Sequence, residues 1–246
     1  MVLKKLTGIT LVLASVLIGM FANTALASVE QPISFLQYDS QWGSKSYTSC
    51  SNYSQTMANS GCGPTAAAMV INYYVDETIT PVEIADYALD NGYRTYNNGT
   101  AYGLFSQLAE ENDLEFLETS SSSEALNWMQ SREDSLIICS MAPGNWTRNG
   151  HYILLWKIEN GNVYINDPGS TNKNRLENTF SLLSSQAKRY FCFNKIEEPI
   201  LEMDLSLLSC ICDSFFNILN EQIELQSNVS FYEPEYILKQ NLSYPM

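Results

Sequence analysis

The sequence Ser60-Gly-Cys-Gly-Pro-Thr-Ala-Ala-Ala-Met-Val70 places a cysteine between two glycines, ahead of a proline and an alanine-rich run. Proline has a fixed φ and no N–H, so a helix tolerates it only in the first turn. Residues 66–74 combine strong helix formers with apolar residues at helical spacing. The pattern therefore predicts a helix that begins at Cys62 or just after it.

This position makes Cys62 a candidate nucleophile. At a helix N-terminus the unpaired backbone N–H groups and the positive end of the dipole favour an anion. A thiol there loses its proton more readily, and the thiolate is the nucleophilic form. The flanking glycines would let a substrate backbone approach the sulfur closely. The alternative is that Cys62 is a small buried apolar residue that opens a core helix.

A thiolate nucleophile needs a general base, and the chain contains one histidine, His151. It lies in Asn149-Gly-His-Tyr-Ile-Leu-Leu-Trp156, where a glycine turn leads into a strand-like run, although strands also often start with a polar residue. A second short strand, Val163-Tyr-Ile-Asn-Asp-Pro-Gly169, ends at Asp167. Asp167 is a candidate to orient the imidazole, but an aspartate before proline is also common in turns.

The loop between these two strands decides whether His151 and Asp167 can meet. The segment Glu159-Asn-Gly161 fits a three-residue hairpin loop, which we predict. That register places Ile153 opposite Asp167 and makes the two site residues diagonal neighbours on one face, ~7–8 Å apart at Cα. A two-residue Asn160-Gly161 loop would shift the register by one and put them on opposite faces.

Four motifs occur in an order typical of one enzyme family: Gln37-Tyr-Asp-Ser-Gln-Trp42, Ser60-Gly-Cys-Gly-Pro-Thr65, Gly150-His-Tyr-Ile153 and Asn166-Asp-Pro168. The chain thereby resembles the C39-like cysteine peptidases, soluble relatives of the domains that trim double-glycine leaders from bacteriocin precursors. The resemblance runs from about residue 33 to 167, and more weakly to 195. It implies an α+β, papain-like fold in which an N-terminal helical part packs its nucleophile helix on an antiparallel sheet.

The resemblance also implies a role for each site residue. Cys62 would be the nucleophile, His151 the base and Asp167 the orienting acid. The family uses an upstream glutamine in its oxyanion hole, and Gln37 fits the Gln-x-Asp-x-x-Trp pattern best. Two further glutamines, Gln41 and Gln55, remain candidates because the interval from Gln37 to Cys62 is long.

The chain ends have a different character from the part between them. Residues 1–27 combine a short basic start, an apolar stretch at 11–21 and an Ala25-Leu-Ala27 cleavage site, which predicts a secretory signal peptide. The mature protein is then expected outside the cytoplasm, secreted or at the cell surface. Residues 28–195 form the predicted peptidase domain. Residues 196–246 are an extension with a predicted amphipathic helix over 199–223. We expect this helix to pack on the domain. The alternative is that it binds a partner or inhibits the enzyme.

Composition limits the partners. The 246 residues carry a formal charge of −14, which argues against nucleic acid and favours cationic peptides. No stretch after the signal approaches the length of a membrane span. None of the six cysteines has zinc-like spacing, and one histidine cannot build a His-rich metal site, so no cofactor or metal is predicted. We assign no disulfide.

The expected elements place helices before strands, as in α+β proteins. A capping box at Thr80-Pro-Val-Glu83 opens a helix that ends near Gly92, and further helices are predicted at 102–112, 121–132 and 179–188. Strands are predicted at 136–141, where every residue but Ser140 is apolar, and at 189–194.

The site motifs, the family resemblance and the signal segment together predict a secreted cysteine peptidase acting on peptides or proteins. The alternatives are an acyltransferase or transglutaminase-like enzyme and a non-catalytic peptide-binding module.

Overall fold

The computed structural model describes residues 30–50, 55–96 and 99–196, together with residues 214, 216–218, 220 and 221. The predicted signal segment, 1–27, lies outside the described residues, as does most of the helix predicted at 199–223. By internal contacts the chain divides into two units, Met1–Ile196 and Glu197–Met246. In the second unit the described positions are helical and exposed. The candidate site belongs to the first unit.

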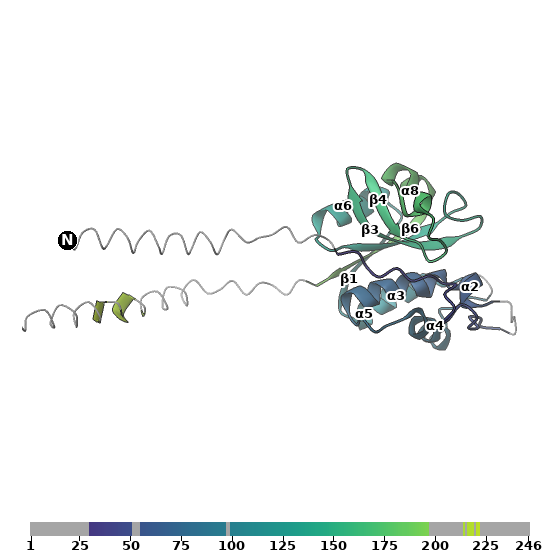
Figure 1. The fold of residues 1–246 in the computed structure, drawn as a ribbon, viewed down its shortest axis with the longest axis horizontal. Coiled ribbons are helices and arrows are strands. Elements are labelled where there is room, and N and C mark those ends of the chain that lie inside the picture. The colour runs from purple at the N-terminus through teal and green to yellow at the C-terminus, as the bar shows by residue number, and fades with distance from the viewer. Residues whose placement is uncertain are drawn as a thin grey trace, which may run out of the picture. The chain divides into compact units, whose positions relative to one another are not determined.

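A six-stranded antiparallel sheet forms the centre of the first unit, in the order β1-β6-β2-β3-β4-β5 (Figure 1). The strands are β1 (Leu114–Thr119), β2 (Leu136–Met141), β3 (His151–Glu159), β4 (Asn162–Asn166), β5 (Glu177–Thr179) and β6 (Ala187–Lys195). β2 and β3 occupy the middle of the sheet, in agreement with their apolar sequences.

Helices cover both faces of this sheet. On one side α3 packs against β3 and α5 against β1 and β6, while α6 and α8 lie on the opposite side (Figure 1). The helices are α2 (Met57–Ser60), α3 (Cys62–Tyr74), α4 (Pro81–Asp90), α5 (Gly103–Glu111), α6 (Ser122–Ser131), α7 (Lys173–Leu176) and α8 (Phe180–Gln186). Among the described residues, no helix is long and apolar enough to cross a bilayer.

Each face of the sheet has its own hydrophobic core. In β2, Leu136 and Ile138 pack with the helices α3, α4 and α5, whereas Ile137 and Cys139 pack with α6 and α8 on the other face. A strand buried on both faces needs apolar side chains in both directions. This explains why the strand is apolar almost throughout and does not alternate.

The predicted α+β, papain-like fold is confirmed, with the cysteine-bearing helix α3 packed on an antiparallel sheet. The capping box forms as expected: Thr80 Oγ1 accepts the Val82 N–H, and the Thr80 N–H donates to Glu83 Oε2 at 3.0 Å. The predicted helices match α4, α5, α6 and α8, and the predicted strands match β2 and β6. The sequence interpretation missed α2, α7, β1 and β5.

The hairpin between β3 and β4 has a shorter loop than predicted. Glu159 pairs with Asn162, so the loop is the two-residue Asn160-Gly161, and the three-residue prediction is wrong. Both loop residues have positive φ, 52° for Asn160 and 79° for Gly161. Asn-Gly suits such a turn because its twist matches that of the two strands.

A β-bulge at Trp156 nevertheless restores the register at the site. Lys157 pairs with Tyr164 but Leu155 pairs with Ile165, so β3 carries one residue more than β4. This extra residue cancels the one-residue shift of the shorter loop. Beyond the bulge the two strands keep the register that the longer loop would have produced, with the two site residues on one face.

Candidate active site

Cys62 is the first residue of α3, as predicted, and its side chain is partly buried. The glycine on each side of it has a packing reason. A Cβ on Gly63 would lie 2.4 Å from Thr100 Oγ1, and one on Gly61 would lie 2.6 Å from the Met57 carbonyl oxygen. The helix can therefore begin at Cys62 only if both neighbours lack a side chain.

Three hydrogen-bond donors surround the Cys62 sulfur. They are the His151 imidazole, the Tyr152 backbone N–H and the Gly63 backbone N–H at the start of α3. Burial raises the pKa of the Cys62 thiol, but the hydrogen bond and positive charge of His151, helped by the two N–H groups, outweigh it. The net pKa of the thiol is lowered, which favours the thiolate.

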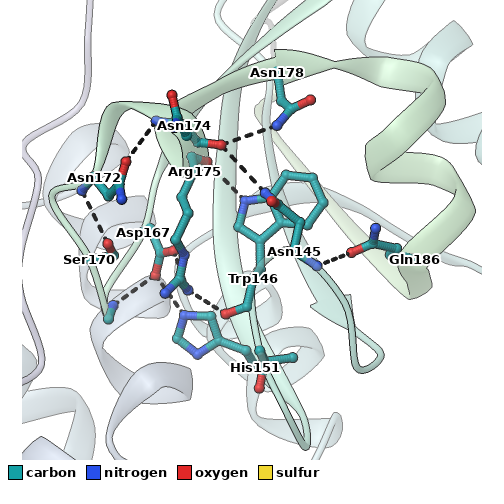
Figure 2. A network of polar contacts seen from close by, with 12 residues as sticks. Asn145, Trp146, His151, Asp167, Ser170, Asn172, Asn174, Arg175, Asn178 and Gln186 are labelled. Carbon is teal, nitrogen blue, oxygen red and sulfur yellow. Dashed lines mark hydrogen bonds and ion pairs between the residues drawn. The ribbon is translucent and has the colours of Figure 1, made fainter.

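His151, the first residue of β3, connects the thiol to Asp167. Its Nε2 lies 2.6 Å from Asp167 Oδ1 (Figure 2), which leaves Nδ1 for Cys62. Burial lowers the pKa of His151, but the hydrogen bonds to Asp167 and Cys62 outweigh it and raise the pKa to about 9. At neutral pH the site therefore favours a thiolate beside an imidazolium.

The segment after Asp167 closes tightly on the imidazole. The Gly169 N–H donates to Asp167 Oδ1 at 2.8 Å, the oxygen that also contacts His151. A Cβ on Gly169 would lie 3.1 Å from His151 Cε1 and 3.2 Å from Nε2. Glycine at this position thus allows the Pro168-Gly169 turn to pack against the ring and hold it.

Asp167 is fully buried, and its second oxygen has a partner that the sequence did not suggest. Arg175 Nη2, from α7, lies 2.6 Å from Asp167 Oδ2 (Figure 2). The same guanidinium nitrogen donates to the Trp146 carbonyl oxygen. Arg175 follows Asp167 by eight residues in a polar segment without a motif. Only the fold brings it to the site.

The structure places the three candidate glutamines in different surroundings. Gln37 is buried, its backbone N–H donates to the Pro168 carbonyl at 2.8 Å, and its Nε2 donates to the Ala58 carbonyl at 2.7 Å. Gln41 is exposed. Gln55 lies near the cysteine helix, but its Oε1 accepts hydrogen bonds from Arg94 and Ser60. Gln37 alone of the three contacts both the segment after Asp167 and α2, the short helix before Cys62.

Among the residues that the structure describes, no second cysteine joins the site. Of the other described cysteines, Cys50 is partly buried, and Cys139 and Cys192 are buried in the core beneath α6 and α8. Burial raises the pKa of both core thiols, that of Cys192 to about 12. Within residues 30–50, 55–96, 99–196 and the few described positions beyond, no cluster of His, Cys, Asp or Glu is arranged to hold a metal ion.

The protein has an α+β fold of the papain-like class, with Cys62 at the start of a helix and His151 on the facing sheet. The chain belongs to the Peptidase_C39 like family, whose family model matches residues 47–196, more than half of its length. A comparison with proteins of curated function found no match.

Two solved structures illustrate the similarity. One is the peptidase domain of Streptococcus ComA, a bi-functional ABC transporter of a quorum-sensing pathway. It is 15% identical, with 56% of this chain and 93% of that chain covered and a TM-score of 0.43. The other is a protein assigned as a C39-like peptidase, from Bacillus anthracis. It is 19% identical, with 56% and 90% covered and a TM-score of 0.38.

Proposed function

We propose that this protein is a secreted cysteine peptidase that hydrolyses peptide bonds with Cys62, His151 and Asp167. One observation carries the proposal: the only histidine of the chain contacts both the Cys62 sulfur and, at 2.6 Å, the Asp167 carboxylate. The family assignment over residues 47–196 supports a peptidase rather than another use of this cluster.

In the proposed reaction the Cys62 thiolate attacks the carbonyl carbon of the scissile bond, and the carbonyl π electrons move to the oxygen. As the tetrahedral intermediate collapses, the C–N bond breaks and the His151 imidazolium gives its proton to the leaving amine. His151 then takes a proton from water, whose oxygen attacks the thioester. Expulsion of Cys62 as thiolate restores the ion pair. Asp167 holds the imidazole in the required orientation throughout.

The oxyanion needs hydrogen-bond donors, and we assign this role to the Cys62 backbone N–H and the Gln37 side chain. A helix leaves its first N–H groups without a partner inside the helix, and Cys62 is the first residue of α3. The Gln37 amide has two hydrogens, of which one is bound to the Ala58 carbonyl. The second is available to an oxyanion at Cys62.

The proposed location and substrates follow from the chain outside the site. Residues 1–27 have the pattern of a cleavable secretory signal. Removal of that segment removes Lys4 and Lys5 and makes the strongly acidic chain still more negative. We therefore expect a soluble extracellular or cell-surface enzyme that prefers cationic peptides.

A digest in H₂¹⁸O tests the reaction. The chain from residue 28 onward is incubated with a peptide library and a primary amine, and the new C-termini are read by mass spectrometry. Hydrolysis places one ¹⁸O in each new carboxylate, because water attacks the thioester, and we expect this product to dominate. Amide-capped C-termini without ¹⁸O would instead identify an acyltransferase. No cleavage at all would favour the peptide-binding module.

A further inference from the structure

We propose that Arg175 is a positioning residue of this site, whose guanidinium fixes the free oxygen of Asp167 and balances its charge, so that the thiolate–imidazolium pair forms at lower pH. The inference rests on the proposed function, since it concerns the same cluster. It adds a fourth group to the cysteine, histidine and aspartate.

The contacts of Asp167 divide the carboxylate into two halves. Oδ1 accepts from His151 Nε2 at 2.6 Å and from the Gly169 N–H at 2.8 Å. Oδ2 faces Arg175 Nη2 at 2.6 Å. Because each oxygen has its own cationic partner, rotation of the carboxylate would break both ion pairs. Arg175 thus keeps Oδ1 turned toward the imidazole.

Arg175 is itself fixed by reciprocal contacts with Trp146, which lies in the loop before His151. The Arg175 guanidinium donates to the Trp146 carbonyl oxygen, and the Trp146 indole Nε1 donates to the Arg175 carbonyl oxygen at 2.8 Å. The Trp146 side chain is buried in the core beneath α6 and α8. The guanidinium therefore connects the two segments that carry His151 and Asp167.

Asparagine side chains support the same two segments (Figure 2). Asn145 Nδ2 and Asn178 Nδ2 both donate to the Asn174 carbonyl, at 3.4 and 3.1 Å. On the other side, Gln186 Oε1 accepts the Asn145 N–H at 2.6 Å. These bonds hold the residue next to Arg175 on one segment and the residue next to Trp146 on the other, so the position of the guanidinium is well defined.

Charge balance gives Arg175 an effect beyond geometry. With thiolate, imidazolium and carboxylate all ionised, Cys62, His151 and Asp167 together carry one negative charge. Arg175 brings the sum to zero. Without it, the remaining negative charge would disfavour the thiolate and favour the imidazolium. Both the formation of the thiolate and the loss of the imidazolium proton would then move to higher pH.

Other ionisable groups around the pair stay the same when Arg175 is changed. On the helix side, Tyr47 and Arg94 interact electrostatically with Cys62, and on β3 Tyr152 does so. From β6, Lys188 Nζ lies 4.0 Å from where a Cβ on Gly150 would stand. None of these groups forms an ion pair with Asp167 in the part of the chain that the structure describes. Their effect on the Cys62–His151 pair is therefore the same in the wild type and in the Arg175 variants.

The test is the alkylation rate of Cys62 by iodoacetamide as a function of pH, read by mass spectrometry on the full mature chain. This rate rises once when the thiolate forms and again when the imidazolium beside it loses its proton. We expect Arg175→Gln to move both steps up by about one pH unit, since it keeps polar contacts but loses the charge. Arg175→Lys keeps the charge and is expected to stay near the wild type.

Arg148→Gln is the matched control. Arg148 is an exposed cation in the loop before His151, and its loss removes the same charge without touching Asp167. Solvent and salt screen such a charge, so both steps should stay in place. A double-mutant cycle with Asp167→Asn adds a second readout: Asp167→Asn alone is expected to move both steps down, and its combination with Arg175→Gln to return them toward the wild type.

The outcomes separate this inference from the proposed function. If the wild type shows no reactive thiolate below neutral pH, the proposed function itself is contradicted. If the wild type shows both steps and Arg175→Gln leaves them at the same pH, the charge role of Arg175 is contradicted. It is also contradicted if Arg175→Lys moves both steps as far as Arg175→Gln does. Thermal unfolding measured in parallel identifies an effect on stability alone. If Arg175→Gln alone does not fold, the charge role of Arg175 is judged from three other variants. They are Arg175→Lys, Asp167→Asn, and Asp167→Asn combined with Arg175→Gln.

Discussion

Replacement of Cys62 by alanine is expected to reduce peptide hydrolysis by about 10⁶-fold, to the background level, because no other group can form the thioester. The fold should survive, since Cys62 is the first residue of α3, its side chain is only partly buried, and alanine is a strong helix former. The measurement is kcat on a peptide identified in the ¹⁸O digest, with circular dichroism to check folding.

Cys50→Ala is the matched control, because Cys50 is the other partly buried cysteine among the described residues. Its activity should equal that of the wild type. A Cys62→Ala protein that keeps its activity within about tenfold of wild type, a difference of only ~1.4 kcal/mol in activation free energy, would exclude Cys62 as the nucleophile.

Asp167→Asn is expected to slow turnover by about 10²–10⁴-fold while the protein stays folded. The amide is nearly the same size as the carboxylate, but it loses the charge that stabilises the His151 imidazolium at 2.6 Å. It also leaves the Arg175 guanidinium facing a neutral group. Turnover and thermal unfolding should be measured on the same preparation, so that activity can be expressed per folded molecule.

Asp39→Asn provides the comparison for Asp167. Asp39 is also a turn aspartate that accepts a backbone N–H, from Gln41 at 2.9 Å, but it lies outside the site. It should change turnover little. If Asp167→Asn lowers stability and leaves the activity per folded molecule unchanged, Asp167 is a turn residue and has no part in the reaction.

The start of the cysteine helix could be predicted from sequence because the signal is local. Pro64 restricts the helix start and the alanine run continues it, so Cys62 at the first position follows from neighbouring residues alone. The same holds for the Thr80 capping box. In both cases the residues within one helical turn determine where the helix begins.

The hairpin shows where local reasoning stops. Glu159-Asn-Gly161 fits the predicted three-residue loop, but Asn160-Gly161 is also a strong two-residue turn signal, and the structure has the shorter loop. The compensating bulge at Trp156 has no glycine or proline to mark it. Trp156 packs against Tyr164 across the hairpin, with ring centroids 5.7 Å apart. Such a cross-strand contact forms only once both strands are paired.

The missing elements depend on distant partners in the same way. β1 carries two glutamates and lacks a regular apolar alternation. It is a strand because it pairs with β6, the last strand of the domain in sequence. Arg175 and Gln37 join the site through contacts with Asp167 and Pro168, which are remote from Gln37 in sequence. Sequence left three glutamines open because their distances to Pro168 depend on the fold.

Alkylation of Cys62 at pH 6 tests the thiolate–imidazolium pair most directly. An ordinary thiol with a pKa of ~8.5 is ionised in only about one molecule in 300 at that pH. The lowered pKa of Cys62 beside His151, whose own pKa is about 9, predicts rapid labelling by iodoacetamide at pH 6. In His151→Ala the cation is lost while burial remains, so the labelling profile should move to higher pH. If Cys62 labels no faster than the other cysteines at pH 6 and His151→Ala changes nothing, the pair does not exist.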